Sequence, residues 1–193
     1  MAHHHGLNAA WHTLGWLGPA EYNRFRDQLG AGSGLHSLAY RHLSFLLGDK
    51  SRALVPAHRV DPEGHRLLLD ALAAPSLYDD VLGLVHRCGY PLPDNVLGRD
   101  PAAGYEPSPD VEAAWAAIYR DEPPGSRLAE LAESLTDLAE AASTWRYRHL
   151  TAVRRAIGGR PGTAGSAGLT WLEKRVGRMY FPELWSARTE VQP

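Results

Sequence analysis

The spacing of hydrophobic and polar positions has the period of an α-helix along almost the whole chain. Apolar residues recur at intervals of three and four, and the two-residue alternation typical of a half-buried strand is weak. Alanine and leucine dominate the apolar positions and both favour helix, whereas valine and isoleucine are few. The pattern therefore predicts an all-α fold without strands.

Segments rich in glycine and proline divide this pattern into a series of helices. Pro19 suits the first position of the first helix, because its ring holds φ near the helical value. Ser76 suits an N-cap, because its hydroxyl can accept from an amide of the first turn. Apolar positions in the second helix (Leu35, Leu38, Leu43 and residues 45–47) indicate a mostly buried element. The expected helices cover residues 20–29, 35–47, 63–72, 76–86, 110–119, 126–157 and 169–179, and residues 89–109 are expected to be irregular.

The longest expected helix carries one continuous apolar stripe at steps of three and four. Its members are Leu131, Leu135, Leu138, Ala142, Trp145, His149, Ala152 and Ala156. A buried imidazole must find a partner, since leaving it unpaired costs a few kcal/mol. Spacing alone favours a hydrogen bond to backbone or a side chain, and the alternative is a metal or haem iron. Arg146 and Arg148 are expected off this stripe, either solvated or paired with anionic groups.

A glycine-rich loop is expected over residues 158–168, where Gly158 and Gly159 end the long helix. The spacing of Gly162, Gly165 and Gly168 matches neither glycine pattern of nucleotide sites, and the loop follows a helix rather than a strand. Glycines permit hinge dihedrals, and Thr163 supplies a hydroxyl. The loop is therefore better interpreted as a mobile cover over a substrate.

Composition narrows the classes of protein. The chain has 193 residues with 44% hydrophobic and 22% charged side chains, which is the globular range. A net charge of −2 argues against nucleic acid as a partner, and no apolar run is long enough to span a membrane. Cys88 is the single cysteine, so no internal disulfide is expected. The first residues lack a hydrophobic signal core, so a cytoplasmic location is expected. The three histidines at 3–5 are read as a tag remnant or natural start, or as a metal-binding tract.

Several separate segments, in the same order, resemble the tryptophan 2,3-dioxygenase family. The most specific is the run WRYRH at 145–149, followed by Ile157-Gly and by PGTAGSAG at 161–168. The others are PAEYNRFRD at 19–27, GAGSGLHSLAYR at 30–41, APSLY at 74–78 and FPEL at 181–184. Together they cover residues 16–190, for which the resemblance implies one haem domain. The implied fold is an all-α helical bundle with a glycine-rich substrate loop.

The resemblance also implies a cofactor, a reaction and site residues. His149 corresponds to the axial ligand of haem b iron. Tyr22, Phe25, Arg26, Ser33 and Thr163 correspond to substrate-binding positions. The implied reaction inserts O2 across the indole C2–C3 bond of L-tryptophan, giving N-formylkynurenine, in a homotetramer. Tyr22, Phe25 and Arg26 lie at i, i+3 and i+4, so they share one helix face. There Arg26 can hold a carboxylate with two parallel bonds, while Phe25 packs against an indole.

One family segment is not found in this chain. Members carry an HQTxELW-type run whose histidine lies on the distal side of the haem, and residues 1–15 resemble nothing in it. No catalytic residue is therefore assigned, and residues 1–15 form an N-terminal segment without an assigned role. The segment is truncated, lost or supplied by another chain. Two alternative functions stay open: an oxygenase of a substituted indole or of tyrosine in a biosynthetic pathway, and a non-catalytic haem-binding partner chain.

Overall fold

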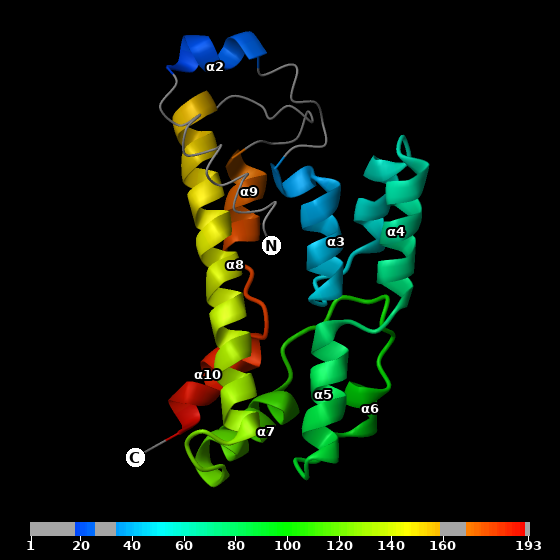
Figure 1. The fold of residues 1–193 in the computed structure, drawn as a ribbon, viewed down its shortest axis with the longest axis vertical. Helices are drawn as coiled ribbons and strands as arrows, with labels where there is room; N and C mark the ends of the chain where they lie inside the picture. The colour runs from blue at the N-terminus through cyan, green and yellow to red at the C-terminus, as the bar shows by residue number, and fades with distance from the viewer. Residues whose placement is uncertain (1–17, 26–33, 159–168, 192–193) are drawn as a thin grey trace. The chain divides into compact units, whose positions relative to one another are not determined.

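The computed structural model describes residues 18–25, 34–158 and 169–191, and it is all-α as predicted (Figure 1). No strand occurs in these ranges, and none of their helices has the length and apolarity to cross a membrane. The α-helices are α2 (Pro19–Phe25), α3 (Leu38–Leu46), α4 (Pro62–Ala73), α5 (Leu77–Arg87), α6 (Asp94–Leu97), α7 (Pro109–Asp121), α8 (Arg127–Ile157), α9 (Leu169–Val176) and α10 (Pro182–Glu190). Two 3-10 helices, η2 (Gly34–His36) and η3 (Arg52–His58), lie on either side of α3.

The chain forms two compact units, each described by itself. We call residues 38–139 and 180–193 the Phe45 unit, and residues 1–37 and 140–179 the His149 unit. The long helix α8 contributes residues 127–139 to the first and 140–157 to the second. The prediction that residues 16–190 form one haem domain stays a prediction.

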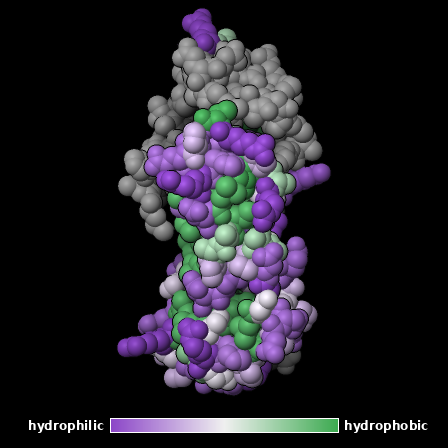
Figure 2. All heavy atoms as spheres, turned by 90° about the vertical axis from the view of Figure 1, so that its right-hand side faces the viewer, coloured by the Kyte–Doolittle hydropathy of each residue, from purple (hydrophilic) through white to green (hydrophobic). Residues whose placement is uncertain are grey.

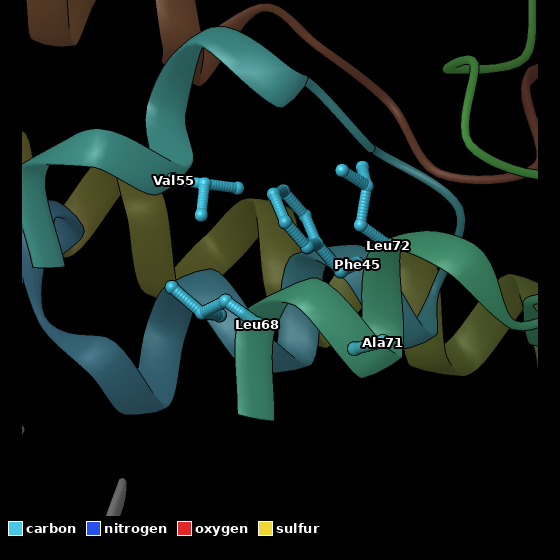
Figure 3. Packing of buried hydrophobic residues seen from close by; sticks show 5 residues of the cluster. All are labelled: Phe45, Val55, Leu68, Ala71 and Leu72. Atoms are coloured by element: carbon cyan, nitrogen blue, oxygen red, sulfur yellow. The ribbon is translucent and has the colours of Figure 1, made fainter. Parts of the chain in front are cut away.

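The Phe45 unit has an apolar core between α3, η3 and α4 (Figure 3). Phe45 and Leu68 are fully buried, and Val55, Ala71 and Leu72 complete the cluster. Each large side chain in such a core stabilises the fold by roughly 1.5–3 kcal/mol relative to an exposed position. The same helices leave some leucines in contact with solvent, and Figure 2 shows hydrophobic residues interspersed among hydrophilic ones on the face viewed.

Helix starts and stops follow the sequence signals closely. Pro19 is the first residue of α2, as predicted. Ser76 caps α5 in a reciprocal capping box: its hydroxyl accepts from the amide of Asp79, whose carboxylate accepts from the amide of Ser76. Gly158 follows the end of α8 with φ at 57°, a left-handed value that glycine adopts without a steric penalty.

Four predictions about the elements are wrong. α10 was not expected, because its apolar residues do not recur on one face, so no periodic signal marks it. Residues 89–109 are not wholly irregular, since α6 forms one turn within them. α9 ends at Val176 rather than at residue 179. In α3, Leu43 and Leu46 are 36% and 44% exposed rather than buried, because only one side of the helix faces the core.

The buried carboxylate of Glu183 joins three parts of the Phe45 unit. Glu183 is 1% exposed, and its Oε1 accepts from the hydroxyl of Tyr78 at 2.7 Å and from the amide of Ser108 at 3.1 Å. Burial raises the pKa of Glu183, because the charged form has lost its water. These bonds connect α10 to α5 and to the start of α7. Tyr78 lies in the APSLY segment and Glu183 in the FPEL segment, so two distant sequence matches meet in one contact.

The turn after α3 packs against Tyr105, whose ring contacts Tyr78. Tyr78 stacks on Tyr105 with ring centroids 4.1 Å apart. Gly48 has a φ of 99°, and a Cβ placed there would lie 2.8 Å from the ring of Tyr105. The turn therefore needs glycine at position 48, both for its dihedral angle and for the space beside Tyr105.

The residue two positions later binds the end of α4. The buried ammonium of Lys50 donates to the carbonyls of Leu72, at 3.2 Å, and of Ala74, so carbonyl groups at the end of this helix have a hydrogen-bond donor.

Gly48→Ala is expected to lower the free energy of unfolding by about 1–2 kcal/mol for the left-handed backbone and about 1–3 kcal/mol more for the clash with Tyr105. Gly89→Ala is the matched control, because Gly89 has the same φ of 99° but nothing within 4 Å of its Cβ. Urea unfolding of both variants measures the difference. Equal losses for the two variants would show that the contact with Tyr105 contributes nothing.

Glu183→Gln is expected to remove a pH dependence of stability. Because the folded pKa of Glu183 is raised, the folded state holds the proton more tightly than the unfolded chain. The unfolding free energy of the parent chain should therefore fall as pH rises from the unfolded value, about 4.3, through the raised folded pKa. Glutamine retains an acceptor for Tyr78 and Ser108 but does not titrate. Urea unfolding at several pH values checks this, and parallel curves for the two proteins would contradict it.

Candidate functional site

His149 lies in the middle of α8, at the end of the WRYRH run, and it is 5% exposed. The indole of Trp145, one turn earlier, stacks on the imidazole with ring centroids 5.5 Å apart and planes 5° from parallel. The i, i+4 spacing on a helix places the two side chains one above the other, and the stack restricts the imidazole to one orientation. The expected burial of His149 is confirmed.

The imidazole of His149 is uncharged at neutral pH. Burial, and to a smaller extent the nearby His36, lower its pKa to about 4. A neutral imidazole keeps a lone pair on one ring nitrogen, which is the form that binds iron and other metals. The electrostatic state of His149 is therefore that of a ligand rather than that of a cation in an ion pair.

A metal ion held by side chains and a haem iron need different numbers of side-chain ligands. Within the described ranges, no group of three or more histidine, cysteine, aspartate or glutamate side chains could hold a metal ion. A protein-held ion needs several such ligands, whereas haem iron takes four donors from its macrocycle and needs only one axial side chain. The buried, neutral imidazole of His149 is compatible with the single side-chain ligand that haem iron needs.

His36 was missed by the sequence reasoning. It ends η2, is half-buried, and belongs to the same unit as His149. The available signal was its position in the GAGSGLHSLAYR segment, three residues after the predicted site residue Ser33. Periodicity could not place it beside His149, because the two residues are far apart along the chain.

The expectation that Arg146 lies off the inner side of α8 is wrong. Arg146 is 1% exposed, and its Nη2 donates to the hydroxyl of Ser143 at 3.2 Å and to the carbonyl of Arg178. The buried surface of this part of α8 is wider than one stripe, because residues 178–179 cover a second side of the helix. Arg148 and Tyr147 are exposed, and Tyr147 reaches 62%.

Two further contacts connect α8 to the segment that begins with α9, which runs beside it in Figure 1. The hydroxyl of Ser143 donates to Sδ of Met179 at 3.4 Å. Nearer the end of α8, Arg154 forms an ion pair with Glu173 at 2.6 Å, and both side chains are about half exposed. Helix α8 and residues 169–179 are thus joined by one buried set of contacts and one exposed ion pair.

The structure places only part of the predicted substrate site. Tyr22 is 4% exposed in α2 and belongs to the His149 unit. Phe25 is the last residue of α2, and its side chain is outside the described part. Arg26, Ser33 and Thr163 lie outside the described residues, as does most of the glycine-rich loop. Their roles stay predictions.

The chain is similar to known proteins over nearly its whole length. The family model described as tryptophan 2,3-dioxygenase matches residues 2–66 and 71–191. A tryptophan 2,3-dioxygenase of Caulobacter vibrioides is 44% identical over 185 residues, which are 96% of this chain and 70% of that protein. Proteins of the same name from Shewanella woodyi and Geobacillus thermodenitrificans are each 40% identical over 96% of this chain. The chain spans 65% and 66% of these two relatives, about two thirds of their length.

Proposed function

Because the chain belongs to the tryptophan 2,3-dioxygenase family, we propose that it acts as a haem-dependent dioxygenase that converts L-tryptophan and O2 to N-formylkynurenine. The observation that carries the proposal is His149: a buried, neutral imidazole stacked on Trp145 at the end of the WRYRH run. Its relatives bear the name of this activity over nearly the whole of this chain.

In this proposal His149 would hold haem b through its iron. The haem would supply the iron needed for chemistry with O2. His149 offers a ring nitrogen whose lone pair is available at neutral pH, because burial holds its pKa at about 4. Trp145 restricts the ring to one plane, and burial keeps water from competing for the ligand nitrogen.

The substrate is assigned to Tyr22 and Phe25 on α2 and to Arg26, Ser33 and Thr163 elsewhere in the sequence. Arg26 would hold the carboxylate of L-tryptophan with its planar guanidinium, and Thr163 would contact the ammonium. Phe25 would pack against the indole, Tyr22 would add a hydroxyl, and Ser33 would lie near the haem. The burial of Tyr22 supports this, since it shows that one face of α2 is turned away from solvent. A homotetramer is part of the same proposal.

His149→Ala is expected to abolish the Soret absorption of the full chain after reconstitution with haemin, because the proposal assigns the iron to this imidazole. His65→Ala is the matched control: His65 is a partly buried histidine on α4 of the Phe45 unit and should leave the spectrum unchanged. Absorption spectra and haemin titrations measure both. Equal haem uptake by His149→Ala and the unsubstituted chain would refute the ligand assignment, and haem uptake without tryptophan turnover would leave a binding role in place of the enzyme.

Arg26→Ala is expected to weaken the binding of L-tryptophan to the haem-loaded protein by roughly 2–5 kcal/mol, the loss typical when one partner of a buried charge pair is removed. Arg24→Ala is the matched control, since Arg24 is an exposed arginine on α2, two residues before Arg26 in the chain. Isothermal titration with L-tryptophan measures the two affinities. An affinity of Arg26→Ala equal to that of Arg24→Ala would remove Arg26 from the site.

A further inference from the structure

Arg146 is a fully buried charged side chain three residues before His149 on the same helix. It is 1% exposed, which is rare for arginine and requires its donors to be used inside the protein. Its Nη2 donates to the backbone carbonyl of Arg178 and to the hydroxyl of Ser143. The guanidinium therefore joins α8 to the segment that follows α9.

Ser143 extends this link. Its hydroxyl accepts from Arg146 and donates to Sδ of Met179, the residue after Arg178. Two successive residues of the chain, 178 and 179, are thus held against one turn of α8, directly before the turn that carries His149. Residues three apart are neighbours on a helix surface. A contact that fixes Arg146 against residues 178–179 therefore also fixes the direction in which His149 leaves α8.

Arg154 provides a contrast within the same pair of segments. It also joins α8 to the α9 segment, through Glu173 at 2.6 Å, but its side chain is 57% exposed and that of Glu173 is 48% exposed. Exposed ion pairs hold geometry weakly, because water and salt compete for both partners. A buried guanidinium has no such competitor, and leaving its partners unsatisfied is costly. The two arginines therefore differ in burial rather than in which segments they join.

We propose that Arg146 is a positioning residue that holds His149 in the orientation needed to ligate haem iron. The inference rests on the proposed function for its haem readout, but the placement of His149 is a property of the chain itself. Metal ligands must be held within a fraction of an ångström of the productive geometry, and groups behind the ligand do this. Lysine cannot replace Arg146 fully, because it lacks the planar, rigid set of donors.

The first test reads the position of His149 without haem. The full chain is labelled with 13C- and 15N-histidine, and the imidazole signals of His149 are assigned by their loss in His149→Ala. Arg146→Met is expected to move these signals by several line widths, because they depend on the stack with Trp145 and on burial. Arg154→Met, the matched control, is expected to leave them in place. Arg146→Lys should move them by an intermediate amount, and unmoved signals in Arg146→Met would overturn the proposal.

Circular dichroism first establishes that each variant folds. If Arg146→Met does not fold, Arg146→Lys and Ser143→Ala decide, since each weakens the contact with residues 178–179 and keeps most of the side-chain volume. Both are expected to move the His149 signals, and signals identical to those of the unsubstituted chain in both would overturn the proposal.

The second test uses the haem-loaded chain. Release of haem to an excess of apomyoglobin should be about 10-fold faster for Arg146→Met than for Arg154→Met, in the range found when the groups behind a metal ligand are lost. Equal release rates would overturn the positioning role. If the unsubstituted chain takes up no haem, the proposed function fails, and displaced His149 signals in Arg146→Met would still support the placement of His149 by Arg146.

Discussion

A polar or charged side chain that leaves water must be given partners inside the protein, and this requirement organises both units. In the His149 unit, α8 buries an imidazole and a guanidinium within one turn of each other, at His149 and Arg146. The first is held uncharged and stacked on an indole, and the second donates to a backbone carbonyl and a hydroxyl. Burial without such contacts would cost several kcal/mol for the charged group. The segment after α9 must therefore pack against α8 so that the carbonyl of Arg178 can accept from Arg146.

The Phe45 unit meets the same requirement with a carboxylate and an ammonium. Glu183 accepts from Tyr78 and from the backbone of Ser108, while Lys50 donates to the carbonyls at the end of α4. These contacts join helices far apart along the chain, whereas the apolar cluster around Phe45 joins near neighbours. Apolar burial supplies most of the stabilisation, and the buried polar contacts restrict which arrangement is formed.

Much of the fold was predictable, because local signals decide where helices begin and end. The cap at Ser76 and the break at Gly158 depend on a few neighbouring residues and appear as predicted. α10 was missed because its apolar residues follow no helical period, so it is a helix held by its contacts with α7 rather than by its own pattern. Leu43 and Leu46 were placed on the wrong side for a related reason: residue type alone does not show which side of a helix meets a core.

The sequence by itself determined the fold class, the family and the identity of His149 as the residue to examine, since these depend on residue types at short spacings and on motifs in order. Tertiary structure alone decided that His149 lies near His36, that Arg146 lies inside rather than in solvent, and that the APSLY and FPEL segments meet through Tyr78 and Glu183. The physical reason is that burial and electrostatic environment depend on segments distant along the chain. One helix shows which residues share a face, but only the packed structure shows what covers that face.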